Sequence, residues 1–203
     1  SKNMSQRSTP EVSKFSGSDY TCITFKPDLE RFKMPFMDDD IVSLLCKRAY
    51  DFAGTSNNAG PKLNVFLNGK KIDAKNFESY IGLYQGVEKP IGFEKVHERW
   101  EIGFGVSDGT FQQVSFVNSI CTMKGGVHVN YIADQVTARL VNTIKKKNKG
   151  TEVKASQIKN HLAVYVNCLV TNPSFDSQTK ENLTTKVSSF GSKCEVGYFE
   201  NKL

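Results

Sequence analysis

The sequence predicts an α+β protein built around a β-β-α-β unit, and three observations support this prediction. Residues 98–123 alternate apolar and polar side chains on both sides of the turn Ser107-Asp108-Gly109, which is typical of two antiparallel strands. Residues 129–147 repeat apolar side chains at helical spacing. Residues 161–170 alternate again, which predicts a strand that returns to the sheet after the crossover helix.

The residues before this unit predict three further elements. The β-branched and aromatic residues of 20–32, interrupted by Pro27, predict a strand that the proline ends. Residues 38–54 predict a helix, because acidic residues begin the segment, apolar residues recur at helical spacing and Gly54 ends it. Its expected apolar face comprises Ile41, Leu44, Leu45, Ala49 and Phe52.

Asn68-Gly69 lies between two β-rich segments and predicts a tight hairpin over 62–72. Residues 1–18, 55–61 and 73–95 predict loops and connectors. A short helix is expected within 154–160, before the strand at 161–170. Gly150 is expected to end the long helix.

Composition limits the class of protein. The 203 residues are 38% hydrophobic and 24% charged, which suits one large or two small globular domains. No apolar run reaches the length of a membrane span, and the polar amino terminus indicates an intracellular protein. Five scattered cysteines predict reduced thiols, and His97, His128 and His161 share no metal spacing, so no metal site is expected.

Positive charge is concentrated at one place. The formal net charge is +6, and the segment "IKKKNKG" includes Lys145, Lys146 and Lys147 at the carboxyl end of the long predicted helix. These lysines can offset the helix dipole, or they can contact nucleic-acid phosphates. No aromatic residues lie among them, so a phosphate contact would favour duplex DNA over stacked single strands.

Two polar segments near apolar elements allow more than one interpretation. The tip Gln178-Thr179-Lys180 is either a solvated loop or a charge and hydrogen-bond donor held out by a rigid strand. The glycines of "GGVHVNY" can present amide groups to an anion, although a plain turn from strand to helix is favoured. No complete catalytic constellation or phosphate-binding GxxxxGK[ST] loop occurs in the sequence.

Several long segments resemble eukaryotic DNA topoisomerase II. They are "DYTCITFKPDLERFKM", "ERWEI", "FQQVSFVNSI", "KGGVHVNYIADQV", "KKKNKG" and "NPSFDSQTKENLT…SSFGSKCE". The resemblance extends over nearly the whole chain and is loosest in 55–95. It implies that residues 1–72 form the C-terminal part of a gyrase/chaperone-type ATP-binding sandwich. Residues 73–203 would form a transducer domain, lacking its C-terminal long helix, with a ribosomal-protein-like β-β-α-β core.

The same resemblance implies roles for individual residues. Lys180 would contact the terminal phosphate of ATP as a phosphate sensor and transition-state cation, supported by Gln178 and Thr179. Lys145, Lys146 and Lys147 would touch duplex DNA. Thr21 would make a water-mediated contact with the adenine base.

The resemblance also implies the setting of the chain. The whole enzyme would be a nuclear homodimer that uses ATP and Mg²⁺ and passes one DNA duplex through another. The main ATP and Mg²⁺ ligands would lie outside this chain, so the fragment alone is expected to be inactive. The alternatives are an RNA- or ribosome-binding module and the transducer of a mismatch-repair or chaperone-type ATPase.

Overall fold

The computed structural model describes residues 5–56, 63–84, 92–148 and 152–197. The chain divides into two compact units, Ser1–Leu45 and Cys46–Leu203. Most of the predicted connector at 55–61, the expected helix end at Gly150 and the last residues of the chain lie outside the described residues.

The strand predicted for 20–32 is wrong. These residues are irregular and end in a turn, and no described segment pairs with them. A strand needs a neighbour that takes up its backbone N–H and C=O groups, and composition alone does not supply one. The apolar side chains of Tyr20, Ile23 and Phe25 are accordingly exposed.

The predicted helix is confirmed as α1 (Asp39–Thr55), but its predicted apolar face is only partly right. The carboxylate of Asp38 accepts a hydrogen bond from the backbone N–H of Ile41 at 2.9 Å, which satisfies one free donor at the helix start. Leu44, Leu45 and Phe52 are exposed. The buried residues belong to the last turns of the helix and are Asp51, Ala53, Gly54 and Thr55.

The hairpin prediction is also confirmed. Strand β1 (Phe66–Leu67) pairs antiparallel with β2 (Lys70–Lys71). Asn68 has φ 49° and Gly69 has φ 77°, which are the two positive angles of a type I′ turn. Helix α2 (Phe77–Ile81), which follows, was not predicted, and the side chain of Asn76 caps it through the N–H of Ser79 at 2.8 Å.

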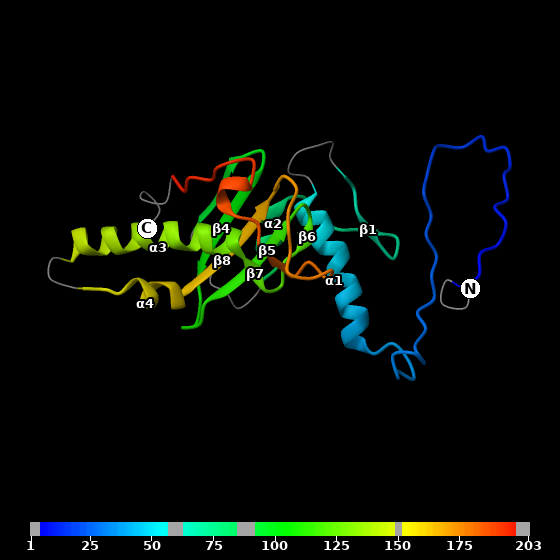
Figure 1. Cartoon of the computed structure of the whole chain (residues 1–203), viewed down its shortest axis with the longest axis horizontal. Coiled ribbons are helices and arrows are strands. Elements are labelled where there is room, and N and C mark those ends of the chain that lie inside the picture. Colours follow the sequence, from blue (N-terminus) through cyan, green and yellow to red (C-terminus); the bar gives the residue numbers. More distant parts are fainter. Residues whose placement is uncertain (1–4, 57–62, 85–91, 149–151, 198–203) are drawn as a thin grey trace. The chain divides into compact units, whose positions relative to one another are not determined.

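A five-stranded mixed sheet forms the centre of the second unit (Figure 1), in the order β3-β4-β8-β5-β6. The strands are β3 (Gly92–His97), β4 (Trp100–Val106), β5 (Gln112–Val117), β6 (Ile120–Cys121) and β8 (Leu162–Cys168). The β-β-α-β order is confirmed, but β4 and β5 do not pair with each other. Strand β8 lies between them, antiparallel to β4 and parallel to β5.

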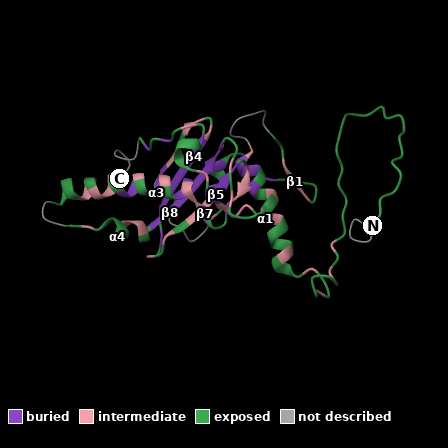
Figure 2. Ribbon diagram, in the orientation of Figure 1, coloured by how far each residue is buried: buried purple, intermediate pink, exposed green. Residues whose placement is uncertain are grey.

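Helix α3 (Val127–Lys147) connects β5 to β8 and covers one face of the sheet. The prediction of this helix is confirmed, with Val129, Ile132 and Val136 buried. Helix α2 and the end of α1 cover the other face, so the central strands are buried on both sides (Figure 2). The remaining elements are α4 (Ala155–Asn160), the short strands β7 (Gly125–Gly126) and β9 (Asn182–Leu183), and a 3₁₀ turn at Val187–Ser189.

A buried polar contact joins the second face of the sheet to the end of α1. The amide of Asn167 donates to the carboxylate of Glu101 at 2.8 Å and to the backbone carbonyl of Thr55 at 3.3 Å. Burial raises the pKa of Glu101, and the hydrogen bond from Asn167 and the charge of Lys95 lower it in part. Ionised Glu101 therefore costs folding free energy.

We predict that Glu101 makes the chain less stable as pH rises. The folded carboxyl keeps its proton above pH 4.5, where the unfolded one loses it, so the free energy of unfolding falls through that window and stays lower above it. Glu101→Gln should remove this slope and leave the chain more stable than the wild type at neutral pH. Denaturant unfolding from pH 4 to pH 8 measures the effect.

Glu98→Gln is the matched control, because Glu98 is exposed on the neighbouring turn and the charge change is equal. Equal pH profiles for the two variants would contradict the assignment of the slope to Glu101.

Candidate functional site

The Gln178-Thr179-Lys180 tip is a tight turn on an irregular hairpin. The backbone N–H of Lys180 donates to the carbonyl of Ser177 at 3.1 Å, which closes the turn, and Lys180 has φ 58°. The hydroxyls of Ser177 and Thr179 lie 2.8 Å apart. Gln178 and Thr179 are exposed and Lys180 is half-buried. The turn brings the three predicted residues together at the end of the hairpin.

Hydrogen bonds below the turn join the two arms of the hairpin. The N–H of Asp176 donates to the carbonyl of Asn182 at 3.3 Å, and the amide of Asn182 donates to the carboxylate of Asp176 at 3.0 Å. Further down, the N–H of Thr184 donates to the carbonyl of Ser174 at 2.9 Å. The tip is therefore part of an ordered hairpin and does not follow β8 directly.

The exit from β8 is held by two side chains. The side-chain oxygen of Asn118 accepts from the N–H of Val170 at 2.9 Å, and its amide donates to the Val170 carbonyl at 3.1 Å. The guanidinium of Arg99 donates to the carbonyl of Leu169 and to the hydroxyl of Thr171. These bonds fix where the chain leaves the sheet before the tip.

Two glycines place the hairpin against the start of α3. Strand β7 (Gly125–Gly126) pairs in parallel with β9, with Gly125 opposite Asn182 and Gly126 opposite Leu183. Gly126 has φ 134°, and a Cβ there would clash with the Leu183 carbonyl oxygen and lie 2.5 Å from the Leu183 nitrogen. Only glycine permits this approach of two backbones. The glycines therefore pair with the hairpin as well as turning the chain into the helix.

Charges beside the tip differ in whether they are paired. Lys124 forms an ion pair with Glu181 at 2.8 Å, which raises the pKa of Lys124. Its backbone N–H also donates to the carbonyl of Glu181. Among the described residues, none forms an ion pair with Lys180. The Lys180 ammonium is therefore a cation available to an anionic ligand.

The predicted lysine run is separate from the tip. Lys145, Lys146 and Lys147 are exposed in the last turn of α3, while the glycines that hold the hairpin lie at the first turn (Figure 1). The described part of the chain places no acidic partner within ion-pair distance of these three lysines. They offset the negative end of the helix dipole and still present free charge to solvent.

The other predicted site residue, Thr21, is exposed and lies in the first unit. Within the described ranges, no group of three or more His, Cys, Asp or Glu side chains could hold a metal ion. None of the described helices is long and apolar enough to span a membrane. All five cysteines are free thiols.

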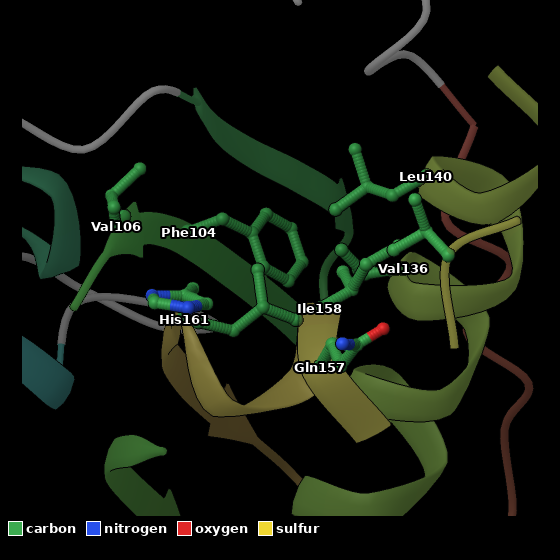
Figure 3. A pocket seen from close by; sticks show the side chains of 10 residues that line it. Phe104, Val106, Val136, Leu140, Gln157, Ile158 and His161 are labelled. Atoms are coloured by element: carbon green, nitrogen blue, oxygen red, sulfur yellow. The ribbon is translucent and has the colours of Figure 1, made fainter. Parts of the chain in front are cut away.

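An apolar cavity in the second unit does not suit phosphate chemistry. It has a volume of about 350 Å³ and lies between α3, α4 and the adjoining ends of β4 and β8 (Figure 3). Phe104, Val136, Leu140 and Ile158 line it, and no Lys, Arg, Asp or Glu of the described residues does so. The cavity therefore lacks the charge that an anionic ligand needs.

Sequence reasoning missed the buried polar groups behind the glycines. His128 and Thr122 are fully buried, and the Nε2 atom of His128 lies 3.1 Å from the hydroxyl of Thr122. That hydroxyl lies 2.5 Å from the hydroxyl of Ser115 on β5. The only signal in the sequence was the position of His128 directly after the glycine pair and one valine.

Comparisons with known proteins agree on one family. A protein-family model described as DNA gyrase B matches residues 66–196. DNA topoisomerase 2-beta of Gallus gallus is 52% identical over 202 residues, which cover 96% of this chain and 12% of the relative. DNA topoisomerase 2-alpha of Sus scrofa is also 52% identical, over 96% of this chain and 13% of the relative. The chain thus spans about an eighth of these relatives.

A solved structure shares the fold. The ATPase region of Saccharomyces cerevisiae topoisomerase II matches with a TM-score of 0.78 and 46% identity, over 88% of this chain and 45% of that chain. The ATPase and transducer domains of Balamuthia mandrillaris DNA topoisomerase II match with a TM-score of 0.75 and 43% identity, over 85% of this chain and 43% of that chain. The predicted fold class is therefore confirmed.

We predict that Gly126→Ala displaces the hairpin, whereas Gly125→Ala leaves it in place. Both glycines have positive φ, so both substitutions cost about 1 kcal/mol of backbone strain. Only the Cβ at 126 meets the Leu183 backbone; at 125 the nearest atom is 3.5 Å away. Gly126→Ala should lower the free energy of unfolding at least twice as much.

Denaturant unfolding gives the free energies, and hydrogen exchange at Lys124 and Thr184 reports the backbone hydrogen bonds around β7 and β9. Equal destabilisation of the two variants would show that the close approach of Gly126 to Leu183 does not limit which residue position 126 can hold.

Proposed function

Because the chain belongs to the eukaryotic DNA topoisomerase II family, we propose that it is part of an ATP-dependent type II DNA topoisomerase. That enzyme passes one DNA duplex through a transient double-strand break in another. This part of it couples ATP binding and hydrolysis to the DNA gate. The observation that best supports this role is the half-buried Lys180 at the end of an ordered hairpin, without an ion-pair partner among the described residues.

Lys180 is the proposed sensor of the terminal phosphate of ATP. An ammonium about 4 Å from a phosphate charge gains about 4 kcal/mol at an effective dielectric constant of about 20, before desolvation. The turn restrains the backbone of Lys180, so only its side chain must be ordered when the contact forms. Gln178 and Thr179 support the contact from the same turn.

Thr21 is proposed for a water-mediated contact with the adenine base. The described chain offers no cluster of side chains that suits Mg²⁺, so its ligands are proposed to lie elsewhere in the enzyme.

Lys145, Lys146 and Lys147 are the proposed contact with duplex DNA. They are exposed and consecutive on one helix end, which suits backbone phosphates and carries no sequence information. We further propose that the enzyme is a homodimer that acts in the nucleus, since its substrate would be chromosomal DNA.

The two alternative functions find less support. An RNA- or ribosome-binding module gives no role to an ordered hairpin that ends in a lysine for which the described part of the chain supplies no ion-pair partner. A mismatch-repair or chaperone-type ATPase is disfavoured by 50% identity to topoisomerases over 96% of the chain.

We predict that Lys180→Ala in the complete enzyme lowers ATP turnover about 100-fold, because the transition state no longer has a fixed positive charge beside it. Lys186→Ala is the matched control, since Lys186 is exposed on the same segment. Steady-state ATP hydrolysis and strand passage measure the effect. Unchanged turnover and strand passage in Lys180→Ala would overturn the assignment.

We predict that replacing Lys145, Lys146 and Lys147 together with Ala weakens duplex binding and flattens its salt dependence. For each phosphate that is no longer neutralised, the slope of log affinity against log salt becomes shallower by about 0.9. The control replaces the exposed Lys70, Lys71 and Lys186, which removes the same charge. If both triple variants bind DNA alike at every salt concentration, the run is only a solvated helix end.

A further inference from the structure

A network of buried hydrogen bonds lies directly behind the glycines that hold the hairpin. It starts at His128 in the first turn of α3, passes through Thr122 and ends at Ser115 in strand β5. All three side chains are buried, with exposed fractions of 0%, 0% and 1%. Each side chain belongs to a different segment, so the hydrogen-bond network joins α3, the residues before β7, and the central sheet.

The donor and acceptor in each of these bonds can be assigned, because the Ser115 hydroxyl has a backbone carbonyl as its acceptor. The Ser115 hydroxyl donates to the Thr122 carbonyl at 3.1 Å, so it accepts from the Thr122 hydroxyl. The Thr122 hydroxyl then accepts from the Nε2–H of His128. Nδ1, which has no partner among the described residues, carries a lone pair rather than a buried, unpaired proton. Burial also lowers the pKa of His128 to about 3, so the ring stays neutral.

The carbonyl of Thr122 also connects the hydrogen-bond network to the glycine pair. The backbone N–H of Gly125 donates to the Thr122 carbonyl at 2.9 Å. The N–H of Thr122 donates back to the carbonyl of Ser115 at 2.8 Å. Gly125 and Gly126 pair with Asn182 and Leu183, which follow Lys180 closely in the chain. A shift of Thr122 therefore moves β7, and β7 moves the arm of the hairpin that carries Lys180.

We propose that Thr122, held between His128 and Ser115, is a positioning residue that sets the place of Lys180 relative to the sheet. None of the three side chains touches the nucleotide; they act through the backbone of β7 and β9. This inference rests on the proposed function of Lys180. It adds that buried bonds about the start of α3 determine whether the lysine reaches the phosphate.

The experiment measures kcat and KM for ATP in the complete enzyme. Thr122→Val keeps the shape and removes the hydroxyl, and it should lower kcat about 10-fold, the effect of removing about one hydrogen bond. Thr122→Ser keeps the hydroxyl and should retain most of kcat. Thr137→Val is the matched control: Thr137 is also buried on α3, but its hydroxyl has no partner among the described residues, so kcat should stay within about 2-fold.

A double variant separates positioning from a general loss of structure. If Thr122 acts through Lys180, Thr122→Val should change kcat less than about 2-fold when Lys180 is already Ala. A further decrease of about 10-fold in that background would overturn the proposal. So would an unchanged kcat in Thr122→Val alone. Unchanged turnover in Lys180→Ala would instead overturn the proposed function.

Ser115→Ala covers the case in which Thr122→Val does not fold. It leaves the bond between His128 and Thr122 intact and removes the two bonds of the Ser115 hydroxyl, while the backbone bond from the Thr122 N–H to the Ser115 carbonyl remains. The same decrease of kcat, absent from the Lys180→Ala background, is expected. A wild-type kcat in a folded Ser115→Ala enzyme would count against the proposal.

Discussion

The close approach of Gly126 to Leu183 is the constraint on which the candidate site depends. A Cβ on Gly126 would clash with the Leu183 carbonyl oxygen, so the two backbones can meet only while that side chain is absent. The contact joins the first turn of α3 to the hairpin whose tip carries Lys180. The carbonyl of Thr122 connects this contact to the sheet, because it accepts hydrogen bonds from the hydroxyl of Ser115 in β5 and from the backbone N–H of Gly125 in β7. The proposed sensor is thus part of the sheet and helix framework, and it is not a free loop.

Strand β8 holds that framework together from the centre of the sheet. Every residue from Leu162 to Cys168 is buried, and the strand pairs with β4 on one side and β5 on the other. The sequence of this strand, LAVYVNC, is apolar on both faces except at Asn167, whose amide donates to Glu101 and Thr55. Such a run indicates a strand covered on both sides, which is a central position. The prediction of two antiparallel strands around Ser107-Asp108-Gly109 did not place β8 between β4 and β5, because alternation within each strand says nothing about which strand is its neighbour.

Local chemistry predicted the elements that need no distant partner. Asn68-Gly69 supplies both positive φ angles of its turn, and the apolar spacing of 129–147 is sufficient to specify α3. The strand at 20–32 failed because pairing, which no local pattern contains, decides whether such residues form a strand. In the site, Lys180 stood out as a charge beyond an apolar strand. The bonds of Thr122 and His128 could not be predicted, since their partners are brought together only by the fold of β5, β7 and α3.

The distance between the two proposed anion contacts limits how they can communicate. Helix α3 has 21 residues, so its first and last turns lie about 30 Å apart at a rise of about 1.5 Å per residue. Ions screen charge interactions in water over about 8 Å at physiological salt, so Lys145–Lys147 cannot act on a nucleotide at Lys180 through their electric field. We therefore propose that coupling between the two ends, if the enzyme uses both contacts, is mechanical. The buried face of α3 includes Ile132 and Val136, which share one buried core with side chains of β4 and β8. A change at the hairpin would then reach the lysine run as a displacement of the whole helix α3. The contact through which the hairpin would act on α3 is the pairing of β7 with β9.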